Sequence, residues 1–192
     1  MEDHRSFIME FIEKTLRGVY EISLNPFKDS RGFFMRTYDV DIFRKAGLDR
    51  DWVQENHSRS EEKGIIRGLH LQLPPYSETK LVRCVVGRVL DIFVDLRKDS
   101  GTFGQWGSIE LSAENKKMAF IPRGFAHGFC SLSGISEVVY KVDNFYSPEH
   151  EVGLIWDDPD IGIDWPFENP ILSEKDQKNM GFKEFVEKYR GL

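Results

Sequence analysis

Val89-Leu90-Asp91-Ile92-Phe93-Val94-Asp95-Leu96-Arg97 is the stretch of the chain that indicates its fold most directly. Branched aliphatic side chains occupy every second position from Leu90 to Leu96. The positions between them carry Asp91 and Asp95 together with apolar residues. Because the side chains of an extended chain alternate between its two faces, this period of two predicts a half-buried β-strand.

The segments beside this strand continue the pattern. The apolar, β-branched segment Lys80–Val86 precedes it, and Gly87-Arg88 supplies a turn between the two. Further turns are expected at Pro122-Arg123-Gly124 and Ser133-Gly134. Four more short strands are expected around these turns, over Ser108–Leu111, Lys117–Ile121, Gly128–Leu132 and Val138–Val142.

Helical patterns are confined to two short segments. Val40–Ala46 ends at Gly47, and Phe182–Arg190 carries apolar residues at i, i+3, i+4 and i+7. No internal repeat or linker is evident, so residues 1–192 are expected to form a single domain. The pattern predicts an all-β protein, a sandwich or jelly-roll barrel with a few short peripheral helices. Small barrels of this kind enclose a ligand cavity.

Composition excludes several classes of protein. The formal net charge is −6, which argues against a general nucleic-acid binder. No apolar stretch approaches the length of about 20 residues that spans a bilayer, and Met1–Phe7 is too polar for a signal peptide. Cys84 and Cys130 belong to no CxxC pair or zinc spacing and are interpreted as buried free thiols. We therefore expect a cytoplasmic protein that does not contact membranes.

Histidines in a jelly roll first suggest a metal site, but their spacing here argues against one. The chain has five: His4, His57, His70, His127 and His150. The position two residues after His70, which faces the same side of a strand, is Gln72 rather than a second histidine. No carboxylate follows closely, and His127 stands alone in its segment. We expect no metal and no other cofactor.

Without a metal, an isolated histidine on a strand is most simply a hydrogen-bonded core residue. Arg67 and Lys80 change that interpretation for His70, because three cationic groups inside one barrel require an anionic ligand or intermediate. Tyr140, on a predicted strand, is either a core tyrosine or a general acid facing His70. Asp176 follows Ser173 at capping-box spacing, so local sequence favours a role at a helix N-terminus.

Many separate motifs, in order along the chain, resemble one family, the dTDP-4-dehydrorhamnose 3,5-epimerases. The resemblance extends from about Leu16 to Asp176 and is very specific. The motifs that carry it are Asp29-Ser30-Arg31-Gly32-Phe33-Phe34, Val53-Gln54-Glu55-Asn56-His57-Ser58, Arg67-Gly68-Leu69-His70-Leu71-Gln72, Lys80-Leu81-Val82-Arg83, Asp95-Leu96-Arg97, Thr102-Phe103-Gly104, Leu111-Ser112-Ala113-Glu114-Asn115-Lys116, Ile121-Pro122-Arg123-Gly124-Phe125-Ala126-His127-Gly128-Phe129, Tyr140-Lys141, Trp156-Asp157-Asp158-Pro159, Gly162-Ile163-Asp164-Trp165-Pro166 and Leu172-Ser173-Glu174-Lys175-Asp176.

The resemblance implies a cupin-like jelly roll, a homodimer without metal, and a nucleotide-diphosphate sugar as substrate. It implies that His70 is the catalytic base and that Asp176 is its carboxylate partner. It further implies that Tyr140 is the general acid and that Lys80 stabilises an enolate. Family substrate-binding positions fall on Arg31, Gln54, Asn56, Arg67, His127, Glu151 and Lys175, and we also expect Arg36, Gln72 and Tyr146 at the substrate.

The sequence departs from the family at one position. Many members have Glu in the motif Arg-Gly-x-x-x-Glu, whereas here the corresponding residue is Arg36. A guanidinium cannot accept a hydrogen bond, so recognition of the nucleotide on that side must differ. The reaction implied is inversion at C3 and C5 of a dTDP-linked 4-keto-6-deoxy sugar. The alternatives are a single-carbon epimerase for a CDP-, UDP- or GDP-linked sugar, a metal-dependent cupin, and a non-catalytic nucleotide-sugar binding module.

Overall fold

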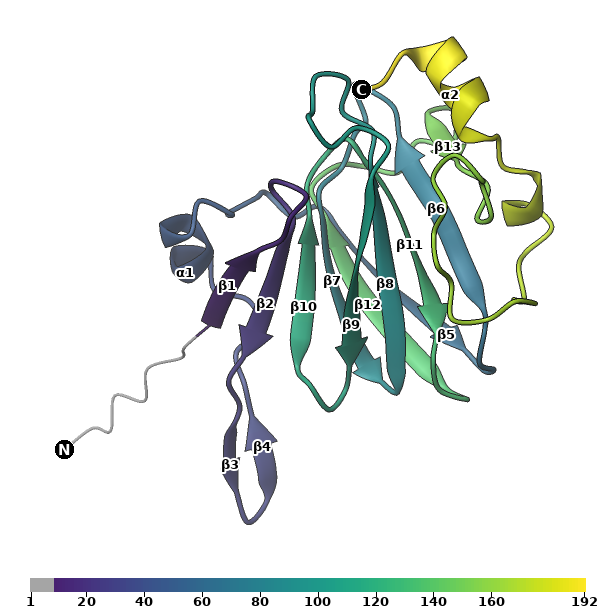
Figure 1. The fold of residues 1–192 in the computed structure, drawn as a ribbon. Helices are drawn as coiled ribbons and strands as arrows, with labels where there is room; N and C mark the ends of the chain where they lie inside the picture. The colour runs from purple at the N-terminus through teal and green to yellow at the C-terminus, as the bar shows by residue number, and fades with distance from the viewer. Residues whose placement is uncertain (1–8) are drawn as a thin grey trace.

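The computed structural model describes residues 9–192, so the polar segment Met1–Phe7 lies outside the described residues. Two antiparallel sheets face each other (Figure 1). The six-stranded sheet runs through β1 (Met9–Glu13), β2 (Tyr20–Leu24), β10 (Lys117–Ile121), β7 (Lys80–Val86), β12 (Ser136–Val142) and β5 (Gln54–Ser60). The five-stranded sheet runs through β13 (Glu151–Gly153), β6 (Ile66–Gln72), β11 (Phe125–Ser131), β8 (Arg88–Asp95) and β9 (Trp106–Ser112). This architecture confirms the predicted jelly-roll barrel.

Three smaller elements lie around the barrel. The hairpin of β3 (Phe27–Asp29) and β4 (Gly32–Phe34) projects away from the two sheets (Figure 1). The short helix α1 (Val40–Lys45) is capped by Asp39, whose side chain accepts from two backbone N–H groups of the first turn. A 3-10 turn, η1 (Asp176–Lys178), precedes the C-terminal helix α2 (Phe182–Tyr189). Both helices begin where the apolar pattern predicts them.

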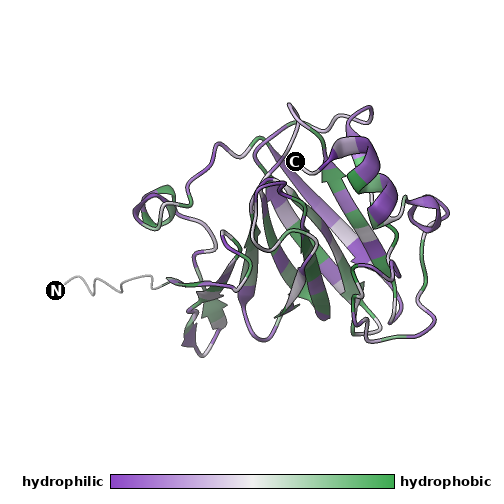
Figure 2. Cartoon of the chain, turned by 45° about the horizontal axis from the view of Figure 1, so that its top comes forward, coloured by the Kyte–Doolittle hydropathy of each residue, from purple (hydrophilic) through white to green (hydrophobic). Residues whose placement is uncertain are grey.

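Three apolar clusters hold these layers together. One lies between the sheets and contains Val82, Phe93 and Val138. A second packs α1, through Phe43, onto the outer face of the six-stranded sheet. The third packs α2, through Phe185, onto the outer face of the five-stranded sheet. In Figure 2 hydrophobic residues are frequent along the strands, whereas many loop segments are hydrophilic.

The strand β8, next to the edge strand β9, is more buried than its sequence predicts. The aliphatic face from Leu90 to Leu96 lies in the outer cluster, under α2 and the segment that leads to it. The opposite face, which contains Asp91 and Asp95, points into the barrel, and both carboxylates are fully buried. The prediction of a half-buried strand was therefore wrong. The C-terminal segment covers the aliphatic face, and the aspartate-bearing face, which the pattern would place in solvent, is buried inside the barrel.

The structure also tests smaller predictions. Cys84 and Cys130 are free and buried, as expected, and burial raises the pKa of each thiol to about 11. The acidic run Trp156-Asp157-Asp158-Pro159-Asp160 would, on its own, be interpreted as a solvated turn. In the structure Asp158 is only 5% exposed, and its Oδ2 accepts from the Phe182 N–H, 2.7 Å away, at the start of α2. Within residues 9–192, no helix has the length and apolar character needed to cross a membrane.

Candidate active site

A cavity opens between the two sheets at one end of the barrel. Its two adjoining compartments, of about 500 and 320 Å³, are both lined by His70, Lys80 and Tyr140. These three side chains therefore lie where the two compartments meet. Of the other predicted site residues, Arg67, His127, Lys175 and Asp176 line the larger compartment, and Gln54, Asn56, Gln72, Tyr146 and Glu151 line the smaller one.

Two facing glycines bring Arg67 and His70 into the same cavity. Residues three apart on a regular strand point to opposite faces. Here the pairing of β6 with β11 shifts register, so that Arg67 and His70 both face inward. Gly68 adopts φ +123° in this irregular segment. A Cβ at Gly68 would meet the Cα of Gly128 at 2.7 Å, so the two strands approach this closely only with glycine at both positions.

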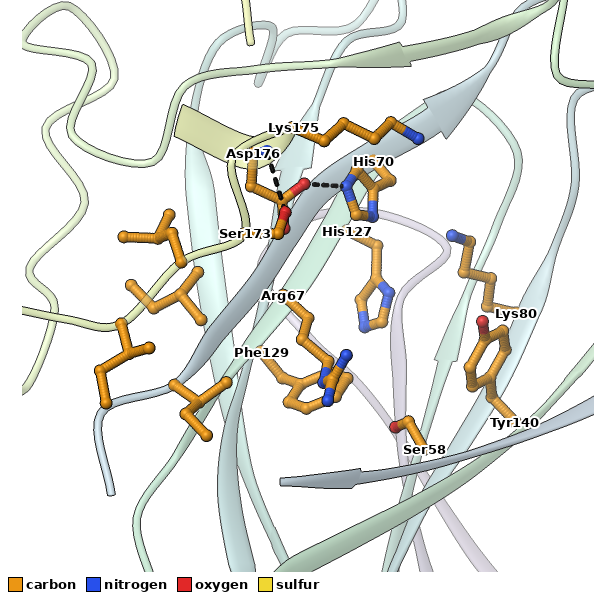
Figure 3. A pocket seen from close by; sticks show the side chains of 14 residues that line it. Ser58, Arg67, His70, Lys80, His127, Phe129, Tyr140, Ser173, Lys175 and Asp176 are labelled. Atoms are coloured by element: carbon orange, nitrogen blue, oxygen red, sulfur yellow. Dashed lines mark hydrogen bonds and ion pairs between the residues drawn. The ribbon is translucent and has the colours of Figure 1, made fainter. Parts of the chain in front are cut away.

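His70 and Asp176 form a close pair on one wall of the larger compartment. The His70 Nε2 lies 2.6 Å from Asp176 Oδ1 (Figure 3). The Gly68 N–H donates to Asp176 Oδ2 at 3.4 Å. The Asp176 side chain is 6% exposed, whereas that of His70 is 28% exposed. Ser173 Oγ accepts from the backbone N–H of Asp176, 3.1 Å away, so the capping interaction expected from local sequence also forms. Asp176 therefore both begins the turn η1 and supplies the carboxylate that pairs with His70.

The pair fixes which nitrogen of His70 carries the proton. Burial raises the pKa of Asp176, but the hydrogen bonds from His70 and the Gly68 N–H outweigh it, so the pKa lies below its usual value. An ionised carboxylate only accepts hydrogen bonds, so Nε2 carries the hydrogen. The Nδ1 lone pair then faces the cavity, where it can accept a proton (Figure 3).

Lys80 and Tyr140 come from the opposite sheet. Lys80 begins β7 and Tyr140 lies on the adjacent strand β12. The Lys80 side chain extends toward His70, and the Tyr140 hydroxyl points into the same space (Figure 3). A base, a phenol and an ammonium group therefore surround one volume, with the base and the phenol on different walls.

Arg67 offers its positive charge to the larger compartment. Its guanidinium donates to Ser60 Oγ at 3.3 Å and to the Arg59 carbonyl at 2.8 Å. Both acceptors are neutral, so they orient the side chain without neutralising it. A guanidinium held in this way is suited to a phosphate group.

His127 takes part in a second histidine–aspartate pair, deeper in the barrel. Its Nε2 lies 2.9 Å from Asp91 Oδ1, and the two side chains are 7% and 0% exposed. His127 is the register partner of His70 on the neighbouring strand. The two histidines therefore lie side by side and both line the larger compartment, but the His127–Asp91 pair is the more deeply buried of the two.

A three-residue cluster lies where the compartments open. Tyr146 donates from its hydroxyl to Glu151 Oε2 at 2.8 Å, and the Lys175 Nζ lies 2.5 Å from the same oxygen. Burial raises the pKa of Glu151, but Lys175 and Tyr146 outweigh it and lower the pKa below its usual value. Gln54 Oε1 accepts from the Tyr146 N–H at 2.7 Å. The cluster fixes the exposed ring of Tyr146 beside the smaller compartment.

Arg31 and Arg36 are absent from the lining of both compartments. Arg31 lies at the tip of the projecting hairpin, where its guanidinium pairs with Asp29 at 2.6 Å. Arg36 pairs with Asp39 at 2.9 Å, next to α1. The structure therefore does not bring these two predicted binding residues to the cavity of their own chain.

The structure adds residues that sequence reasoning missed. Glu78 lines the smaller compartment and lies 3.1 Å from the Lys80 Nζ. Glu78 lies two residues before Lys80, and residues two apart in an extended chain point to the same face. The sequence could therefore have predicted that Glu78 faces the cavity together with Lys80. Ser58 lines the larger compartment with its hydroxyl buried. Within residues 9–192, no group of three or more His, Cys, Asp or Glu side chains is arranged to hold a metal ion.

A jelly-roll cavity that presents an oriented imidazole, a phenol and an ammonium group defines a class of protein that moves protons on a bound ligand. Comparison with known proteins identifies the family. The family model for dTDP-4-dehydrorhamnose 3,5-epimerase matches residues 13–184. The chain belongs to this family and is an isomerase of the dTDP-4-dehydrorhamnose 3,5-epimerase type.

Individual relatives support this assignment. The dTDP-4-dehydrorhamnose 3,5-epimerase of Shigella flexneri is 50% identical over 175 residues, which cover 91% of this chain and 96% of the relative. The crystal structure of the Bacillus anthracis enzyme of the same name, with TDP and PPi bound, is 42% identical with a TM-score of 0.89, covering 91% of this chain and 100% of that one. A dTDP-4-dehydrorhamnose 3-epimerase of Streptomyces niveus is 37% identical over 163 residues, 84% of this chain and 78% of the relative.

Proposed function

We propose that the protein converts dTDP-4-dehydro-6-deoxy-D-glucose to dTDP-4-dehydro-L-rhamnose by inverting C3 and C5. In this proposal His70 is the base, Tyr140 is the acid and Lys80 stabilises the intermediate. The observation that carries it is the His70–Asp176 pair, which faces a cavity that Lys80 and Tyr140 line from the other sheet.

The chemistry of the substrate matches these groups. A ketone at C4 acidifies the C–H bonds at C3 and C5, so removal of either proton gives an enolate with its charge on the C4 oxygen. Imidazole titrates close to neutral pH and suits the role of the base. The ammonium of Lys80 stabilises the enolate oxygen more than the neutral ketone, so it lowers the barrier to proton removal. Asp176 stabilises the imidazolium that forms on His70.

Inversion requires a second group. The proton removed by His70 must be replaced from the opposite face of the sugar ring. Tyr140 lies on the facing sheet and carries a hydroxyl that can donate this proton (Figure 3). His70 then releases its proton to solvent and Tyr140 regains one from solvent, so both groups are ready for the second carbon. After one such cycle at each carbon, C3 and C5 are inverted and the C4 ketone is restored.

The charged and aromatic residues suit a nucleotide diphosphate. Arg67 and Lys175 would bind the phosphates, and the exposed ring of Tyr146 would stack on the base. Gln54, Asn56, His127 and Glu151 would bind the remaining polar groups. The TDP bound to the Bacillus anthracis relative supports the thymidine nucleotide.

A second candidate is epimerisation at a single carbon, or on a CDP-, UDP- or GDP-linked sugar. Arg36, which replaces a carboxylate acceptor common in the family, favours a different nucleotide. The Streptomyces niveus relative, named a 3-epimerase, favours a single inversion. Titrations with dTDP, UDP, CDP and GDP, followed by NMR of the product formed from the matching 4-keto sugar, separate these candidates. Tightest binding of dTDP and a doubly inverted product are expected; a singly inverted product would contradict the main proposal.

We further propose a cytoplasmic homodimer in which the β3–β4 hairpin of one subunit completes the cavity of the other. The hairpin projects from its own barrel, and its Phe33 and Phe34 are 53% and 64% exposed. Arg31 and Arg36 do not line the cavity of their own subunit. In this arrangement they would lie beside the substrate bound in the cavity of the other subunit. The free thiols Cys84 and Cys130 suit a reducing compartment.

Subunit mixing tests the shared cavity. Arg31→Ala and His70→Ala proteins are each expected to be impaired. In a mixed dimer, one cavity would receive an intact hairpin and an intact His70. We expect mixing to restore up to about a quarter of the wild-type activity, given that random exchange makes half the dimers mixed and each of these has one intact cavity. A monomer in light scattering, or no restoration after verified exchange, would contradict this arrangement.

A further inference from the structure

The ammonium group of Lys80 has a partner that the proposed chemistry does not use. Glu78 Oε1 lies 3.1 Å from the Lys80 Nζ, and the two side chains are only 13% and 10% exposed. A lysine so far removed from water is costly unless an opposite charge lies beside it. Glu78 supplies that charge from within the cavity lining.

Glu78 also accepts a hydrogen bond from Gln72. The Gln72 Nε2 lies 3.1 Å from Glu78 Oε2, so each carboxylate oxygen has its own donor. The same Nε2 also contacts the carbonyl oxygens of Tyr76, at 3.0 Å, and Phe145, at 3.1 Å. Gln72 Oε1 accepts from the Ser147 N–H at 2.6 Å. The amide of this 4% exposed side chain is therefore committed to the protein.

The backbone that carries Glu78 is fixed as well. The Thr79 N–H donates to Asp143 Oδ1 at 2.6 Å. The Asn144 Nδ2 donates to the carbonyls of Pro75 and Ser77, at 3.1 and 3.2 Å. These contacts tie the segment before β7 to the segment after β12, so the Glu78 carboxylate has little freedom to move.

We propose that Glu78, buttressed by Gln72, is a positioning residue that holds the Lys80 ammonium where the enolate oxygen forms. The inference rests on the proposed function and deepens it. A lysine side chain has four rotatable bonds and loses much freedom when it is fixed. One contact to Glu78 restrains the ammonium and leaves two of its N–H groups for the cavity. A donor already in place needs no reorganisation when charge develops on the substrate.

Glu78→Gln is an informative substitution because the two carboxylate oxygens of Glu78 contact two different donors. Each oxygen faces a donor, so Glu78→Gln replaces one of two acceptors by an NH₂ group and must lose or reverse one contact. Glu78→Asp keeps the charge and both acceptors but shortens the reach by one methylene. Because Lys80 would act on the enolate rather than on the bound ketone, we expect the loss in kcat rather than in KM.

Glu21 provides a matched control. It is a glutamate with a 12% exposed side chain, and it pairs with Lys117 at 2.6 Å. It lines neither compartment of the cavity. Glu21→Gln therefore removes a lysine-paired carboxylate of similar burial from a site without a proposed role in the reaction.

The test measures kcat, KM and the melting temperature of the full-length wild-type, Glu78→Gln, Glu78→Asp and Glu21→Gln proteins on the 4-keto sugar nucleotide. For Glu78→Gln we expect kcat to fall roughly 10- to 100-fold, less than the loss of an oxyanion donor itself costs, with KM within about twofold. Glu78→Asp should lie between Glu78→Gln and the wild type. A crystal structure of Glu78→Gln should show the Lys80 Nζ displaced.

Three outcomes would overturn the inference while the proposed function stands. The first is a kcat for Glu78→Gln that matches that of Glu21→Gln, and the second is an Nζ that stays in place. The third is a rise in KM that exceeds the fall in kcat, which would show that Glu78 serves binding. An inactive wild-type protein would instead refute the proposed function, and the inference with it.

Discussion

Two histidine–aspartate pairs lie side by side in this barrel, and their surroundings differ. His70 is partly exposed to the cavity, and Asp176 receives hydrogen bonds from both His70 and Gly68. His127 and Asp91 are almost completely buried, and Asp91 Oδ2 has no hydrogen-bond partner within residues 9–192. The same residue types thus occur in two environments.

The difference indicates which pair performs chemistry. A general base must reach its substrate, and the carboxylate behind it must be well enough solvated by hydrogen bonds to remain ionised as the imidazolium forms. The pair on the cavity wall meets both requirements. The inner pair is shielded, so it is suited to fixing the ring of His127 as part of the cavity floor.

The largest expected effect is that of His70→Ala. Loss of a general base should lower kcat roughly 10³- to 10⁴-fold, with little change in the melting temperature, because the site is partly open to solvent. His127→Ala should lower kcat much less and the melting temperature more, because it leaves Asp91 buried without a partner. Steady-state rates and thermal unfolding of the two variants check this. Equal losses of kcat would remove the distinction between the pairs.

Tyr140→Phe tests the division of labour across the cavity. Without the phenol, His70 can still remove a proton and return one to the same face. We expect inversion to fall roughly 10²- to 10³-fold while exchange of the proton with solvent persists. NMR of the substrate in D₂O follows both processes. Loss of exchange and inversion to the same extent would argue against Tyr140 as the opposing acid.

Asparagine substitutions compare the carboxylates directly. Asp176→Asn should lower kcat by about 10²-fold or more, because an amide can donate to Nε2 and leave the hydrogen on the wrong nitrogen of His70. Asp91→Asn should change kcat by less than about tenfold, since His127 is not the base. Rates measured on both purified variants provide the comparison, and a larger loss for Asp91→Asn would reverse the assignment.

The smallest effect concerns a carboxylate outside both pairs. Burial raises the pKa of Asp95, but hydrogen bonds from Arg97, Ser100 and Thr102 outweigh it and lower the pKa to about 2. Since the folded-state pKa lies below the ordinary value of 3.8, the stabilisation is present above that pH and is lost as the pH falls toward 2. It amounts to about 2 kcal/mol at neutral pH. Acid unfolding of Asp95→Asn should show a weaker dependence on pH in this window; an unchanged dependence would contradict the cause given.

The sequence predicted the elements whose apolar residues alternate. The strands β7, β8, β10 and β12 and both helices were found within a few residues of their observed bounds. The strand β5 was not found, because Gln54–Ser60 is almost entirely polar and its inward side chains face a cavity rather than a core. Burial of both faces of β8 was missed because it depends on α2, nearly 100 residues away.

The site was predictable from the residues only in part. The cations at Arg67 and Lys80 indicated an anionic ligand near His70. Regular strand periodicity would place Arg67 and His70 on opposite faces. Both face the cavity only because the strand pairing shifts register at Gly68. No local pattern could pair His70 with Asp176, which lies 106 residues away; the family resemblance alone suggested that pair.

The most direct test of the central claim follows deuterium from D₂O into C3 and C5 of dTDP-4-dehydro-6-deoxy-D-glucose, with the wild type and His70→Ala side by side. We expect the wild type to label both carbons and to give the doubly inverted product, and His70→Ala to label neither above the uncatalysed rate. Undiminished labelling by a folded His70→Ala protein, or no labelling by the wild type, would contradict the assignment of His70 as the base.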